Sequence, residues 1–75
     1  MAIDYEYRRV VHHGGRTFRA TTTMADIFAA HARDIIARGD TELVPLLHSS
    51  GVDLLLIGPG SGFSITVVET STARP

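Results

Sequence analysis

A glycine cluster at residues 58–62, Gly-Pro-Gly-Ser-Gly, follows an apolar run and is the pattern closest to a known binding motif. In dinucleotide-binding folds such a run joins a strand to a helix, and the N-terminus of that helix holds the pyrophosphate. Here residues 63–68 alternate and are rich in β-branched side chains, which predicts a strand instead. The tail that follows is too short for a βαβ unit. We therefore interpret the cluster as a turn and expect no cofactor.

The four histidines have no spacing typical of a metal site. His12 and His13 are adjacent in a predicted turn, where neighbouring side chains diverge, and a metal ion needs several convergent ligands. His31 lies on the apolar stripe of a predicted helix, and His48 ends a second predicted helix. The serines lie outside any nucleophile-elbow pattern, and the carboxylates form no close pair within apolar sequence. We expect no metal site and no catalytic residues, with an active site shared between subunits as an alternative.

Basic side chains concentrate in the N-terminal part of the chain. The group consists of Arg8, Arg16 and Arg19, with His12 and His13 between them. Arginines on a β-ribbon near aromatic residues are able to bind nucleic acid or another anion. The net charge of −1 argues against a protein devoted to nucleic acid, and a solvated surface is the simpler interpretation. Anion binding at this hairpin remains an alternative function.

An N-terminal hairpin is predicted by the alternation of apolar and polar residues. Residues 3–11 form its first strand, and residues 16–22 form the second. The pair Gly14-Gly15 supplies the positive φ angles that a two-residue turn requires. This turn places Val11 opposite Phe18.

Two helices are expected after the hairpin. Thr23 and Asp26 resemble a capping box, and the helix that they begin stops at Gly39. Its expected apolar stripe is Met24, Ile27, Phe28, His31, Ala32, Ile35 and Ile36. A shorter helix is expected over residues 40–49, with Pro45 near its first turn.

A second hairpin is predicted from residues 51–57 and 63–68, the most apolar part of the chain. A four-residue loop between them would pair Leu56 with Ile65. Leu54 and Leu56 of the first strand would then face the helices.

The opposite face of that hairpin is expected to carry Leu55, Ile57 and Val68. A sheet face that meets water is usually more polar than this, so these three residues are the expected interface with another molecule. The chain has 75 residues and no cysteine, and a chain of this size buries only about 60% of its unfolded surface. Association is therefore the expected source of additional stability.

The element order ββααββ predicts one α+β domain over residues 1–75. We expect two layers, a mostly antiparallel four-stranded sheet with helices on one face, and a polar tail at residues 70–75. No leader pattern and no apolar run of membrane-spanning length is present, which favours the cytoplasm. All seven basic residues are arginine, which favours a GC-rich bacterial genome.

The leading hypothesis for function is a non-catalytic protein-interaction or assembly module. Its expected partner is itself, as a homo-oligomer formed through an apolar sheet face, or another protein. No membrane partner and no cofactor are expected.

Overall fold

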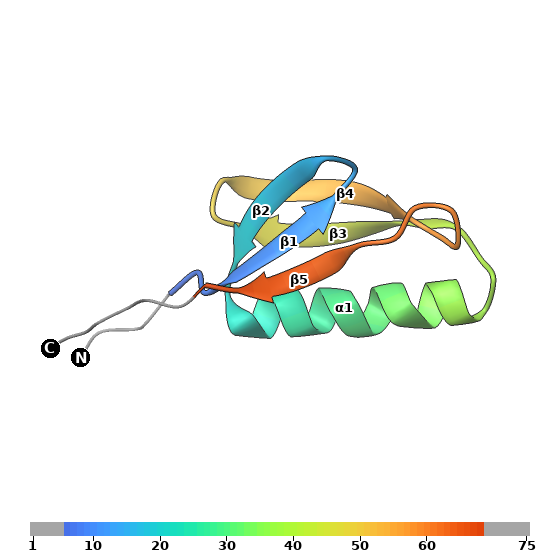
Figure 1. The fold of residues 1–75 in the computed structure, drawn as a ribbon, viewed down its shortest axis with the longest axis horizontal. Helices are drawn as coiled ribbons and strands as arrows, with labels where there is room; N and C mark the ends of the chain where they lie inside the picture. The colour runs from blue at the N-terminus through green and yellow to red at the C-terminus, as the bar shows by residue number, and fades with distance from the viewer. Residues whose placement is uncertain (1–5, 69–75) are drawn as a thin grey trace, which may run out of the picture.

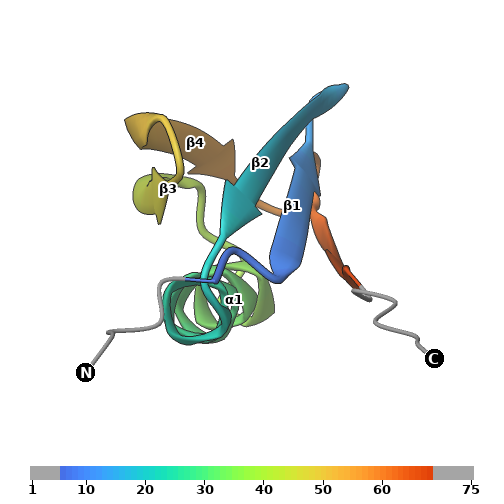
Figure 2. The ribbon, with the colours of Figure 1, turned by 90° about the vertical axis from the view of Figure 1, so that its left-hand side faces the viewer.

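The computed structural model describes residues 6–68, which form five strands and one helix. In chain order these are β1 (Arg9–His13), β2 (Arg16–Ala20), α1 (Thr22–Ala37), β3 (Glu42–His48), β4 (Gly51–Ile57) and β5 (Ser64–Val67). Strands β2, β1 and β5 form an antiparallel sheet in that order, and β3 and β4 form a separate antiparallel hairpin. Helix α1 runs along one side of the strands (Figures 1 and 2). The expected α+β class is confirmed, but the single four-stranded sheet is wrong.

The N-terminal hairpin forms with the predicted turn and register. Gly14 and Gly15 have φ angles of 58° and 79°, and Val11 lies opposite Phe18. Two positive φ angles in a two-residue loop match the twist of the flanking strands, which is why this hairpin could be predicted locally. Strand β1 begins at Arg9 and not at residue 3. Residues 3–5 of the predicted strand, and the predicted tail at 70–75, lie outside the described residues.

The N-cap of helix α1 lies two residues before the predicted cap. Thr21 is the N-cap, and its Oγ1 accepts a hydrogen bond from the backbone N–H of Met24 at 3.1 Å. Thr23, the predicted cap, lies inside the helix. The predicted stop at Gly39 is confirmed, because Gly39 has a φ of 75° just beyond the helix.

The buried side of α1 is richer in alanine than the predicted stripe. It consists of Ala25, Phe28, Ala29, Ala32 and Ile35. Ile27 is 59% exposed and His31 is also exposed, so both were wrongly assigned to the core. Small side chains on the buried side allow the helix axis to lie close to the strands, and this favours the alanine side over the side that carries Ile27.

The predicted second helix is wrong, because residues 42–48 form strand β3. The exposure of its side chains alternates along the strand: Val44 and Leu46 are 1% exposed, whereas Leu43 and Leu47 are at least half exposed. This alternation has the period of a strand. Pro45 would interrupt a helix, but a strand accommodates proline where its missing N–H faces away from the neighbouring strand.

The predicted pairing of residues 51–57 with 63–68 is also wrong. Leu56 of β4 lies opposite Leu43 of β3, and Ile65 of β5 lies opposite Val11 of β1. The glycine cluster at 58–62 is therefore a crossover between two sheets and not a hairpin turn. The expected register depended on these two segments being neighbours, and the nearby strand β3 takes that place.

The core lies between α1 and the inward faces of both sheets (Figure 2). Its buried members are Val11, Phe18, Ala20, Ala25, Phe28, Ala32, Ile35, Val44, Leu46, Leu55 and Ile57. Phe63, in the segment before β5, packs edge-on against Phe28 with ring centroids 5.3 Å apart. All the elements therefore contribute to one core.

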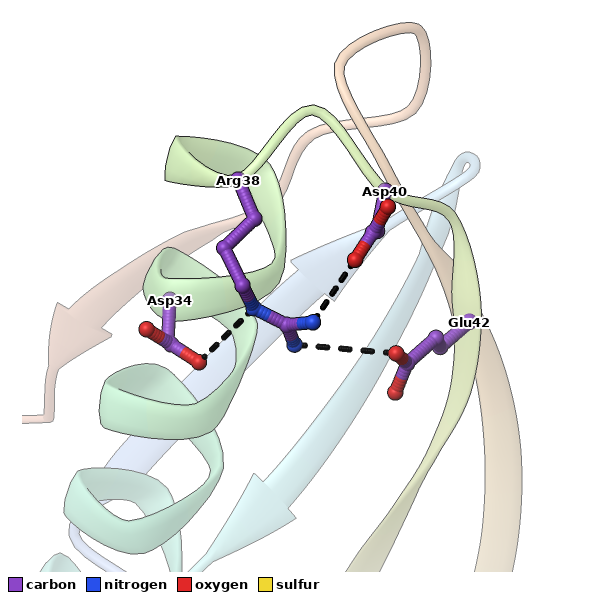
Figure 3. Close-up of polar contacts among 4 residues, drawn as sticks. All are labelled: Asp34, Arg38, Asp40 and Glu42. Carbon is purple, nitrogen blue, oxygen red and sulfur yellow. Dashed lines mark hydrogen bonds and ion pairs between the residues drawn. The ribbon is translucent and has the colours of Figure 1, made fainter.

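Arg38 fastens the start of β3 to the end of α1 (Figure 3). Its guanidinium lies 3.1 Å from a carboxylate oxygen of Asp34, 2.6 Å from one of Asp40 and 3.6 Å from one of Glu42. Loss of solvent alone would lower the pKa of Arg38, but the attraction and hydrogen bond of Asp34, with the charges of Asp40 and Glu42, raise it. The group therefore remains a cation that pairs with all three carboxylates.

Candidate functional site: the outward face of the β3–β4 hairpin

The outward face of the β3–β4 hairpin consists entirely of apolar side chains. We call it the outer ribbon face, and its members are Leu43, Pro45 and Leu47 of β3 and Val52, Leu54 and Leu56 of β4. The cross-strand pairs are Leu43 with Leu56, Pro45 with Leu54, and Leu47 with Val52. All six are exposed, and the five larger ones are between 50% and 61% exposed.

The inward side of the same hairpin fixes which residues face out. Val44, Leu46, Leu55 and Ile57 are at most 3% exposed and belong to the core. A shift of one residue in either strand would exchange its buried and exposed sets, so the core holds the register. The turn of the hairpin is attached as well, because the N–H of Ser49 donates to the carbonyl of Arg19 in β2 at 2.8 Å.

The other sheet has an outward face of a different kind. Its members are Val10, His12, Thr17, Arg19, Ser64 and Thr66, which are polar except for Val10. On this face a ring nitrogen of His12 lies 3.0 Å from the hydroxyl of Thr66. A sheet face that meets water normally has this composition. The outer ribbon face is apolar at every position, so it is the surface that we expect another molecule to cover.

The size of the outer ribbon face fits a docking surface. The exposed parts of its side chains amount to roughly 500 Å² of apolar surface, in the upper part of the range for the largest apolar patch of a monomer, and such patches are often functional. Two such faces in contact would bury on the order of 1,000 Å², the lower limit for a specific interface, before any rim residue is counted.

A small pocket adjoins the outer ribbon face at Leu47. It has a volume of about 260 Å³ and is lined by Tyr7, Thr21, Met24, Leu47 and His48. Its walls come from the first turn of α1, the segment before β1 and the end of β3, so it extends the apolar surface beyond the hairpin.

The structure places the predicted interface residues differently. Leu55 is 3% exposed and Ile57 is fully buried, so neither is available to another molecule. Val68 is half-buried after β5, and its N–H donates to the carbonyl of Arg8 at 2.8 Å. The expectation of an apolar sheet face was made for the wrong side of β4, because Leu54 and Leu56 project outward instead. Residues 43–47 are all apolar, so the sequence does not show which of their side chains face outward beside Leu54 and Leu56.

The basic residues of the N-terminal hairpin are divided between the two faces of its sheet. His13 lies opposite Arg16, and the next pair, His12 with Thr17, faces the other way. Arg19 shares the face of His12, because Arg19 lies opposite Val10. The register therefore separates Arg16 and His13 from Arg19 and His12.

Each of these basic groups also has contacts within the chain. Arg8 pairs with Glu6, and Arg19 donates to the carbonyl of Tyr7 at 2.9 Å. Arg16 lies over the ring of Phe18, 4.7 Å from its centroid, and 3.6 Å from a carboxylate oxygen of Asp53. His13 donates from Nε2 to the carbonyl of Leu56 at 2.8 Å.

His48 and Asp53 form the closest approach to a catalytic pair in the described residues. Nε2 of His48 lies 2.7 Å from a carboxylate oxygen of Asp53, and the His48 side chain is 8% exposed. Nδ1 of His48 accepts the backbone N–H of Ser50 at 3.2 Å, so the ring proton is on Nε2 and is donated to Asp53. Neither ring nitrogen keeps a free lone pair, and this geometry closes the turn between β3 and β4.

Within residues 6–68, no cluster of three or more histidine, aspartate or glutamate side chains forms a possible metal site. The described helix is too short and too polar to cross a membrane.

No protein-family model matches the chain, and no curated protein or solved structure matches it either.

Proposed function

We propose that this chain is a non-catalytic assembly module that associates with copies of itself through the outer ribbon face. One observation supports the proposal above all: all six outward side chains of the β3–β4 hairpin are apolar and exposed. A hairpin of two strands is marginal in water, and covering both of its faces would stabilise it.

A second copy fits this face better than a partner of opposite charge. The face has no charged side chain that would select such a partner. The same apolar face on a second copy has a matching composition. The net charge of the chain is only −1, so two copies repel each other weakly. The area that two faces would bury reaches the range of specific interfaces, at about 1,000 Å².

The substitution Leu54→Glu tests the proposal. Leu54 is 60% exposed near the middle of the outer ribbon face, so a glutamate there leaves the fold intact but places a charge in the contact. We expect the unmodified chain to have a molar mass above that of one copy in light scattering at micromolar concentration. The Leu54→Glu variant is expected to have the mass of one copy and an unchanged circular dichroism spectrum.

Ile27→Glu is the matched control. Ile27 is 59% exposed but belongs to α1 and not to the outer ribbon face, so this variant is expected to associate like the unmodified chain. A monomeric unmodified chain at all concentrations tested would refute self-association. Equal loss of association in both variants would mean that the outer ribbon face has no special part in it.

A further inference from the structure

The free edge of β3 is poorly suited to pair with another strand. Pro45 lies in the middle of β3, opposite Leu54, and has no N–H to donate. Proline fits a strand where its nitrogen faces away from the neighbour, so the missing donor lies on the free edge. An added strand would find no donor at Pro45 and would meet the proline ring, a common protection against edge-to-edge pairing.

On the outer edge of β4, the backbone carbonyl of Leu56 is bonded to side chains of the same molecule. The carbonyl of Leu56 accepts hydrogen bonds from Nε2 of His13 at 2.8 Å and from the hydroxyl of Ser61 at 2.9 Å. In an antiparallel ladder every second pair directs its N–H and C=O groups away from the neighbouring strand. Pro45–Leu54 is such a pair, and Leu43–Leu56 is the next pair of the same type, so the Leu56 carbonyl faces away from β3. His13 comes from the tip of the N-terminal hairpin, and Ser61 comes from the crossover, where it bridges to Gly58.

We propose that two copies pack as a closed, twofold-symmetric pair with their outer ribbon faces stacked, and that the sheets are not extended edge to edge. This inference rests on the proposed function and specifies the geometry of the contact. Pro45 disrupts the edge of β3, and the hydrogen bonds to the Leu56 carbonyl occupy one end of the edge of β4, whereas the face is open and apolar along its whole length. An isologous contact uses the same face of both copies and leaves none for a third, so assembly stops at two.

The centre of the outer ribbon face lies at the symmetry axis of such a pair. The pair Pro45–Leu54 has one apolar pair on either side of it, Leu43–Leu56 and Leu47–Val52. When the two faces overlap fully, which buries the most apolar surface, the centre of one face meets the centre of the other. Stacked sheets lie about 10 Å apart, so the two Leu54 side chains come within reach of a short cross-linker.

Cysteine cross-linking tests this geometry directly, because the natural chain has no cysteine. Leu54→Cys places one thiol near the proposed axis, and Val67→Cys places one on β5 at the same exposure of 60%. Both variants are treated with a short bis-maleimide that spans about 10 Å, the separation of stacked sheets. We expect Leu54→Cys to form covalent dimers at least tenfold faster than Val67→Cys.

The mass of the unmodified chain in light scattering completes the test. A plateau at twice the mass of one copy supports a closed pair, whereas a mass that keeps rising with concentration refutes it. A dimer in which Val67→Cys cross-links as fast as Leu54→Cys would also overturn the proposed geometry, although self-association itself would stand. A monomer at every concentration would instead refute the proposed function.

Discussion

Single glycines in this chain serve two different physical purposes. Gly14 and Gly15 supply positive φ angles, which the sequence predicts from their position between two alternating segments. Gly58 has a different role, because a Cβ at this position would lie 2.4 Å from Oγ1 of Thr41. The sequence places Gly58 in a glycine cluster but gives no sign of this contact, because Thr41 is distant in the chain.

Gly58→Ala is expected to destabilise the fold. The added methyl group would also meet Cβ of Thr41 at 3.0 Å, so rotation of the threonine side chain does not fully relieve the clash. Overpacking of this kind costs about 1–3 kcal/mol in the free energy of unfolding. Urea denaturation followed by circular dichroism measures this cost.

Gly60→Ala is the control for Gly58→Ala, because a Cβ at Gly60 meets nothing within 4 Å. The control is expected to unfold at the same urea concentration as the unmodified chain, or slightly higher. Equal stability of the two alanine variants would contradict the close approach of Gly58 to Thr41.

At the scale of elements, the accuracy of sequence-based prediction follows the range of the interactions. The N-terminal hairpin and α1 depend on neighbouring residues, namely two glycines, a cap and a stop at Gly39, and both were predicted. Strand β3 was not, because leucines at 43, 46 and 47 fit a helical period as well as a strand. The pairing of Val44 with Leu55 in the following strand decides between them.

The candidate site was missed for the same reason. The sequence predicts that one face of residues 51–57 is apolar and exposed, which is correct, but the face expected to be exposed, that of Leu55 and Ile57, is the buried one. That choice depends on whether β4 packs beside β3 or beside β5. Both β3 and β5 offer apolar side chains to β4, so the sequence alone does not select the neighbour that sets the register.

Thr21→Ala tests where helix α1 begins. The Thr21 hydroxyl accepts the N–H of Met24, and loss of such a cap costs about 0.5–2 kcal/mol in the free energy of unfolding. Thr23→Ala is the matched control, and it is expected to cost less because Thr23 lies inside the helix. Urea denaturation of both variants measures the difference, and a larger loss for Thr23→Ala would place the cap at Thr23, as the sequence predicts.

At the scale of the whole molecule, the apolar residues are shared between one core and one exposed face. The buried core draws on both sheets and α1, whereas the outer ribbon face adds six apolar side chains that remain exposed in a single copy. Small domains without disulfides have little stability to spare. If the outer ribbon face is covered by a second copy, part of the stability of each chain comes from association.

Thermal unfolding at several concentrations measures that part. When a folded dimer unfolds to two separate chains, each tenfold dilution lowers the stability by about 0.7 kcal/mol per chain, and the Tm by about 3–5 °C for a chain of this size. We expect this dependence for the unmodified chain and for Ile27→Glu. The Leu54→Glu variant is expected to have a lower Tm that does not change on dilution. A Tm of the unmodified chain that is independent of concentration, at concentrations where light scattering shows a dimer, would mean that the outer ribbon face adds nothing to the stability of the fold.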